Sequence, residues 1–146
     1  MRKGRLTTRA RGACLLSVLF VFTAGATPAS GQSGAANCEA LESLHLLDVQ
    51  IVSAEERVAG PFAMRGGRAE VTIDLPAFCQ VIALGTPTSD SEIRFEVWLP
   101  SARAWNGRLL GTGNGGYTGA IQYRALADGL RQGFAVVGSD TGHVGS

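Results

Sequence analysis

The clearest hydrophobic pattern in the chain is an alternation of polar and apolar side chains over residues 92–99. Alternation with a period of two is typical of a β-strand, whose successive side chains point to opposite faces. One face carries four apolar side chains, Ile93, Phe95, Val97 and Leu99, before Pro100 ends the run. A second, shorter strand is predicted at 108–111, and we expect it to pair antiparallel with the first strand.

A helical pattern follows residue 119. Apolar side chains recur at helical spacing over 120–130, at Ile121, Tyr123, Leu126, Ala127 and Leu130. Gly133 is the expected C-terminal cap, because glycine readily adopts left-handed backbone. The uninterrupted apolar run at 134–139 then predicts a buried parallel strand. The order strand, strand, glycine-rich loop, helix, strand is typical of an α/β sheet.

The first half of the chain predicts shorter elements. Leucines recur every three residues over 38–47, which predicts a short helix with Asn37 as its N-cap. His45 lies among these leucines, and we interpret it as a surface residue rather than a ligand. Strands are predicted at 49–54, 69–73 and 79–84, with a turn at 65–68 and a loop at 85–90.

The first 30 residues have the pattern of an export signal. Five basic residues precede a twelve-residue apolar run at 13–24, and small residues suited to cleavage follow. A transmembrane helix requires about 20 apolar residues, so this run is too short to be one. We therefore expect a secreted or periplasmic protein with no membrane association after cleavage, and an uncleaved anchor is the alternative.

Removal of that segment changes the charge and the cysteine count. The remaining chain has eight basic and 12 acidic residues, a net charge of −4, which argues against nucleic-acid binding.

Cys38 and Cys79 remain, and an even pair of cysteines in an oxidising compartment predicts a disulfide. It would close a loop of about 42 residues, worth roughly 4 kcal/mol. Two buried free thiols are the alternative, and we predict no metal site, because neither cysteine has a partner at metal-binding spacing.

Six of the chain's 20 glycines fall within residues 105–119. Glycine permits left-handed backbone and lets main-chain N–H groups come close to a ligand. The cluster is therefore either a structural turn or a site where backbone amides bind negative charge. Two kinds of negative charge fit the sequence, a pyrophosphate and a transient oxyanion.

A dinucleotide site is the first of these interpretations. Gly111, Gly113 and Gly116 match the G-x-G-x-x-G fingerprint, and Asp140 ends the next predicted strand 24 residues after Gly116. However, the loop continues to residue 119, so no helix begins at the second glycine to bind a pyrophosphate. An exported protein also meets little nicotinamide cofactor.

An oxyanion hole is the second interpretation. A backbone N–H can stabilise the alkoxide that develops during ester hydrolysis from a distance of about 3 Å, provided that no side chain intervenes. In α/β-hydrolases one such donor comes from a glycine-rich loop that follows the third strand. Here the strands at 92–99 and 108–111 would precede that loop, which would be 113–119.

At these residues the sequence resembles the tannase and feruloyl esterase family of α/β-hydrolases, which includes the hydrolase of mono(2-hydroxyethyl) terephthalate. The resemblance spans residues 38–146 in family order, with matching stretches at 75–79, 93–100, 105–108, 113–119 and 139–143. Cys38 lies where the family has its first cysteine, paired with the equivalent of Cys79. The resemblance implies an exported serine esterase that hydrolyses small-molecule esters of aromatic acids, such as galloyl or feruloyl esters.

The resemblance also implies roles for loop residues. By position in the motif, the N–H of Gly116 is the expected oxyanion donor, with Gly115 as the alternative. Asn114, Asp140 and His143 are expected to brace the loops from behind. Ser139 is not the nucleophile, because it is the second and not the third residue of a five-residue stretch bounded by glycines.

The family's nucleophile lies in a later Gly-Cys-Ser-x-Gly-Gly-like elbow, and its triad Asp and His follow a lid domain that often holds calcium. These parts are not among the 146 residues. We therefore expect a signal peptide at 1–30, a disulfide-linked α+β segment at 31–90 and the first part of the α/β-hydrolase domain at 91–146. Such a chain would be truncated, inactive alone and without a cofactor of its own. A small secreted binding module without catalysis is the alternative class.

Overall fold

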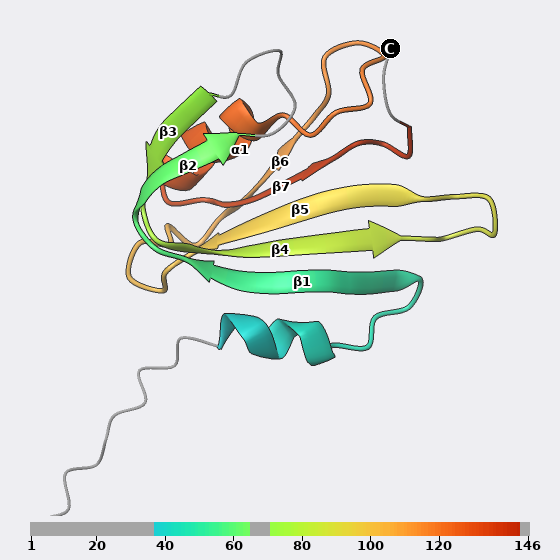
Figure 1. Cartoon of the computed structure of the whole chain (residues 1–146), viewed down its shortest axis with the longest axis horizontal. Helices are drawn as coiled ribbons and strands as arrows, with labels where there is room; N and C mark the ends of the chain where they lie inside the picture. Colours follow the sequence, from blue (N-terminus) through green and yellow to red (C-terminus); the bar gives the residue numbers. More distant parts are fainter. Residues whose placement is uncertain (1–36, 65–70, 144–146) are drawn as a thin grey trace, which may run out of the picture. The chain divides into compact units, whose positions relative to one another are not determined.

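A mixed five-stranded sheet forms the centre of the computed structural model, which describes residues 37–64 and 71–143 (Figure 1). The sheet has the strand order β1-β4-β5-β7-β6. Its strands are β1 (Val49–Arg57), β4 (Phe78–Gly85), β5 (Ile93–Pro100), β6 (Leu109–Thr112) and β7 (Ala135–Ser139). The other elements are a hairpin of β2 (Gly60–Met64) and β3 (Val71–Leu75), the 3-10 helix η1 (Cys38–Ser43) and the helix α1 (Tyr123–Arg131).

The strand pairing corrects one expectation. β6 does not pair with β5, because β7 lies between them, antiparallel to β5 and parallel to β6. The predicted antiparallel pair of 92–99 with 108–111 is therefore wrong. The physical reason lies in burial, since the continuous apolar run of β7 needs neighbours on both edges and both faces. The shorter β6, with Leu109 66% exposed, occupies the edge instead.

Hydrophobic side chains cover both faces of the sheet. On one face, α1 and the β2–β3 hairpin pack on the sheet around seven buried residues, Leu75, Phe78, Trp98, Leu126, Ala127, Leu130 and Val136. On the other face, η1 packs around Cys38, Ala54, Cys79 and Val81. Because successive side chains of a strand point to opposite faces of the sheet, each strand can contribute apolar side chains to both clusters.

A buried carboxylate joins α1 to the sheet. Glu96 is only 5% exposed and accepts hydrogen bonds from Gln80 Nε2 at 2.8 Å and from Trp98 Nε1 at 2.8 Å. Tyr123 Oη donates to its other oxygen at 2.7 Å. A buried charge is tolerated only when such partners satisfy it. The side of β5 that carries Glu96, which the sequence pattern marks as polar, thus packs against the larger core.

The predicted short helix at 38–47 is present, but it ends four residues earlier. The segment forms the 3-10 helix η1, which ends at Ser43, and the backbone is extended at Leu44. The leucine spacing of three matches the three residues per turn of a 3-10 helix, and such helices are short. The N-cap is confirmed, because Asn37 Oδ1 accepts a hydrogen bond from the N–H of Glu39 at 3.3 Å.

The other expected elements are present with small shifts. The predicted strands correspond to β1, β3, β4, β5, β6 and β7, and the helix to α1. The cap at Gly133 is confirmed, with φ +81° and a hydrogen bond from its N–H to Leu130 O at 2.9 Å. Phe134 N–H donates to Gly129 O at 3.1 Å, which completes a Schellman motif.

Three expectations are not tested by this fold. The signal segment at 1–30 and the turn at 65–68 lie outside the described residues. The boundary at residue 90 falls between β4 and β5, neighbouring strands of one sheet, and the division stays a prediction. Within 37–64 and 71–143, no helix is long and apolar enough to span a membrane.

The disulfide between Cys38 and Cys79 is confirmed. It joins the first residue of η1 to β4, with the two Cα atoms 5.6 Å apart, and both side chains are buried. The bond is the covalent part of the smaller core, which otherwise contains few large side chains. The loop it closes is long, so its removal has a large effect on the entropy of the unfolded chain.

The double variant Cys38→Ser with Cys79→Ser is expected to unfold more easily, with a free energy of unfolding lower by about 2–5 kcal/mol. Urea titration followed by circular dichroism measures the change. Ser89→Ala, in the exposed loop after β4, is the matched control and should leave the urea midpoint unchanged. An unchanged midpoint in the double variant would contradict a stabilising role for the bond.

Candidate oxyanion-binding loop

Two loops leave the same edge of the sheet. β6 and β7 are parallel neighbours, so the segment 113–122 after β6 and the turn 140–143 after β7 both begin at carboxyl ends (Figure 1). The carboxyl edge is where open α/β sheets bind ligands. Because β6 and β7 are adjacent, the two loops begin side by side.

Side chains and backbone hold the two loops together. His143 Nε2 lies 2.8 Å from Tyr117 O, and since a carbonyl only accepts, this nitrogen carries the proton and donates. Asn114 Nδ2 donates to Thr141 Oγ1 at 3.2 Å. Gly119 makes the closest approach, because a Cβ there would lie 1.8 Å from His143 O. Hydrogen bonds of polar side chains and the close approach of Gly119 therefore hold the two loops together.

Asp140 fixes the turn after β7 to the neighbouring strand β5. It is 7% exposed, and its Oδ1 accepts hydrogen bonds from Arg94 N–H at 3.0 Å and Gly142 N–H at 2.9 Å. Its own N–H donates to Arg94 O at 2.9 Å. A hydrogen bond to Glu92 and the charge of that carboxylate raise the pKa of the Arg94 guanidinium, with a smaller contribution from Asp140. Asp140 is thus bound within the fold and not presented to a ligand.

Gly115 and Gly116 are exposed residues of this loop. Neither N–H donates a hydrogen bond to any residue that the structure describes. The carbonyl oxygen of Gly115 closes the turn. It accepts hydrogen bonds from Thr118 Oγ1 at 2.7 Å and from Thr118 N–H at 3.4 Å. Free backbone N–H groups in such a turn can bind a negatively charged oxygen.

The steric demands on these glycines differ. A Cβ at Gly115 or Gly116 would meet nothing within 4 Å, whereas one at Gly119 would clash with backbone. Only Gly116 of the pair needs glycine for its backbone, with φ +64°. Packing alone explains Gly119 but not Gly115, so a purely structural turn accounts for only part of the glycine cluster.

The geometry does not support a dinucleotide site. A pyrophosphate would bind at a helix N-terminus directly after the glycines. Here α1 begins only at Tyr123, and its N-cap Gln122 makes no side-chain capping bond. Asp140, which would bind the ribose, is occupied by backbone donors of the protein.

The remaining candidate residues lie apart from this edge or serve other contacts. His45 is exposed just after η1, and His143 contacts Thr141 and Tyr117 rather than Ser139. Across the described ranges, no group of three metal-binding side chains comes together. Sequence reasoning missed Thr141, Gly119 and Glu96. A glutamate within an alternating strand carries no signal that distinguishes a buried residue from an exposed one.

Gly119→Ala is expected to separate the two loops and lower stability by about 1–3 kcal/mol, because its methyl group cannot fit against the backbone of His143. Amide spectra should show shifts at Thr141 and His143 together with a lower Tm. Gly113→Ala is the matched control, since a Cβ there meets nothing within 4 Å. Equal spectra and Tm for the two variants would show that the loops do not touch.

Comparison with known proteins adds the family. Residues 79–146 match the family model described as tannase and feruloyl esterase. An uncharacterised esterase of Xanthomonas campestris pv. campestris is 45% identical over 111 residues, which is 76% of this chain and 19% of that protein. A probable feruloyl esterase B-2 of Aspergillus flavus is 50% identical over 76 residues, 52% of this chain and 14% of that protein.

A solved structure agrees with these sequence matches. Feruloyl esterase B from Aspergillus oryzae superposes with a TM-score of 0.64 at 34% identity, over 74% of this chain and 22% of that chain. The present chain spans about a fifth or less of the length of these relatives. Its mixed sheet is part of an α/β-hydrolase domain, and the chain belongs to the tannase and feruloyl esterase family.

Proposed function

We propose that this chain supplies the oxyanion-binding loop of a secreted serine esterase that hydrolyses small-molecule esters of aromatic acids. One observation carries the proposal. Gly115 and Gly116 lie exposed at the carboxyl edge of the sheet, and their N–H groups have no hydrogen-bond partner in the described part of the chain. The family relationship supports ester hydrolysis as the chemistry. The chemical class of the ester is carried over from the names of the relatives.

The loop would act on charge that develops during the reaction. When a serine attacks the ester carbonyl, its oxygen becomes negative, and preorganised N–H donors stabilise it. Gly116 N–H is the proposed donor, with Gly115 N–H as the alternative. The second donor in this type of hydrolase is the N–H of the residue after the nucleophile. That residue and the triad would come from sequence beyond residue 146, so the present chain alone would not turn over an ester.

Three polar residues would keep the donors in place. Asn114 and His143 connect the glycine loop to the turn after β7, and Asp140 connects that turn to β5. None of the three needs to touch substrate in this scheme. Their loss would alter the position of the loop, and with it the distance between the donor and the oxyanion.

The reading frame past codon 146 tests the proposal directly. We expect a Gly-Cys-Ser-x-Gly-Gly-like elbow in the sequence that follows. The 146-residue chain should show no hydrolysis of p-nitrophenyl acetate above a heat-denatured control. A stop codon directly after Ser146 would refute the esterase for this chain, and turnover that is lost in Ser139→Ala would refute our exclusion of Ser139.

Replacing the Gly116 amide by an ester tests the donor itself in the protein that includes the nucleophile. Incorporation of glycolate at position 116 removes the N–H and keeps the shape of the backbone. We expect kcat to fall by about 100- to 1,000-fold, as for other oxyanion-hole deletions, with little change in KM. Glycolate at position 113 is the matched control. If position 115 and not 116 gives the loss, the donor is Gly115, and if neither does, the loop is not the oxyanion hole.

A further inference from the structure

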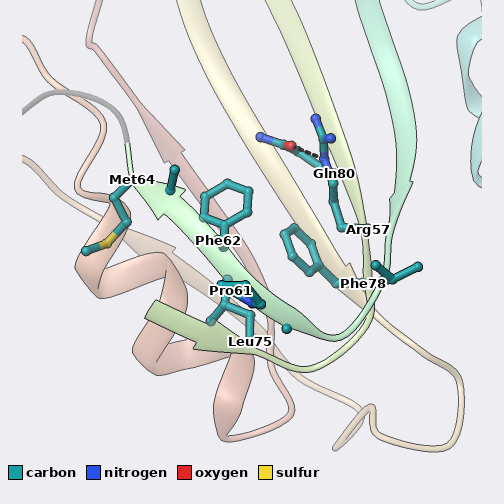
Figure 2. Close-up of a pocket in the computed structure, with 10 residues that line it drawn as sticks. Arg57, Pro61, Phe62, Met64, Leu75, Phe78 and Gln80 are labelled. Atoms are coloured by element: carbon teal, nitrogen blue, oxygen red, sulfur yellow. Dashed lines mark hydrogen bonds between the residues drawn. The ribbon is translucent and has the colours of Figure 1, made fainter. Parts of the chain in front are cut away.

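A pocket lies between the β2–β3 hairpin and the adjoining ends of β1 and β4. Its volume is about 560 Å³, and Figure 2 shows the residues that line it. Pockets of roughly 300–1,000 Å³ are the usual size for small-molecule sites. All of its lining residues belong to the described part of the chain.

The pocket and the glycine loop lie at opposite ends of the strands of the sheet. Arg57 is the last residue of β1 and pairs with Phe78, the first residue of β4. β4 runs in the same direction as β7, because both are antiparallel to β5. Phe78 therefore lies at the amino edge of the sheet, opposite the carboxyl edge from which the glycine loop leaves. A ligand in this pocket would not occupy the proposed oxyanion site.

One part of the pocket wall is apolar and aromatic. Phe62 packs edge-on against Phe78, with ring centroids 5.8 Å apart, and against Trp98 at 5.0 Å. Met64, Leu75 and Pro61 extend this surface along the hairpin (Figure 2). Aromatic edges and a thioether form favourable contacts with an aryl ring.

The other part of the wall presents a fixed cation. Arg57 Nε donates to Gln80 Oε1 at 2.8 Å (Figure 2). Gln80 Nε2 donates in turn to the buried carboxylate of Glu96. Arg57 Nη2 forms an ion pair with Glu55 at 2.9 Å, in which both side chains are partly exposed. Nη1 has no hydrogen-bond partner among the described residues. The guanidinium is thus oriented, with donors free to bind an acceptor.

We propose that this pocket binds a small aromatic carboxylate, with the aryl ring against Phe62, Phe78 and Met64 and the carboxylate on the guanidinium of Arg57. A carboxylate matches the fork of donors that a guanidinium offers. A phosphate or sulfate would leave the aromatic wall uncovered, and an ammonium ligand would be repelled by Arg57. The exposed pair with Glu55 is weak enough to be exchanged for a ligand.

The test is a titration of the 146-residue chain with cinnamate. The sequence contains two methionines, Met1 and Met64, so ¹³C-methyl labelling gives only two signals, and one of them reports on the pocket residue Met64. Saturable movement of the Met64 methyl signal is expected, with a Kd on the order of 1 mM or tighter for a ligand of this size. Cinnamyl alcohol, which lacks the charge, and acetate, which lacks the ring, should both bind at least about tenfold more weakly.

Variants separate this site from a general affinity for aromatic acids. Arg57→Gln should weaken cinnamate binding by about tenfold or more, and Arg57→Lys by less. Glu55→Gln removes the competing carboxylate and should strengthen binding. The matched control is Arg103→Gln in an exposed turn, which should have no effect.

The proposal is overturned if the Met64 signal does not saturate by about 10 mM cinnamate. It is also overturned if Arg57→Gln and Glu55→Gln both bind like the unaltered chain. Shifts confined to Gly115 and Gly116 would place the ligand at the glycine loop, which would contradict this pocket without contradicting the esterase. Conversely, a missing nucleophile elbow would refute the esterase and leave the pocket unaffected.

Discussion

The insertion of β7 between β5 and β6 determines how the rest of the molecule is arranged. Because β7 is parallel to β6, the connection between them must bring the chain back to the edge of the sheet at which β6 begins. Helix α1 forms the main part of this connection. The loops before α1 and after β7 then begin side by side at the carboxyl edge. The contact of Gly119 with His143 and the bond of His143 to Tyr117 follow from that proximity.

The buried carboxylate of Glu96 gives this arrangement a polar connection through the core. It receives donors from β4, β5 and the first residue of α1, so the position of α1 is coupled to the sheet by oriented hydrogen bonds as well as by packing. Gln80 extends the connection to Arg57. The same network therefore orients the helix that follows the glycine loop and the guanidinium that faces the pocket at the opposite edge.

The sequence predicted most elements and the disulfide, because alternation, helical periodicity and cysteine count are local or compositional signals. It did not predict the strand order, since the pairing of β5 with β7 depends on burial across distant segments. The hairpin strand β2 was not predicted, and its first two residues, Gly60 and Pro61, are of types that are rare in strands. For the candidate site, the resemblance to the family indicated Gly115, Gly116, Asp140 and His143, and their roles stay predictions. Thr141 and the tight approach at Gly119 depend on how two loops meet in space.

The central claim is that the glycine loop presents a backbone N–H to the oxyanion of a serine esterase. The most direct measurement is a crystal structure of the protein that includes the nucleophile, inhibited with diethyl p-nitrophenyl phosphate. A phosphoryl oxygen mimics the oxyanion of the tetrahedral intermediate. The account predicts that this oxygen lies about 3 Å from the amide nitrogen of Gly116. An adduct whose oxygen is bound by other donors, with the amides of Gly115 and Gly116 still facing solvent, would contradict it.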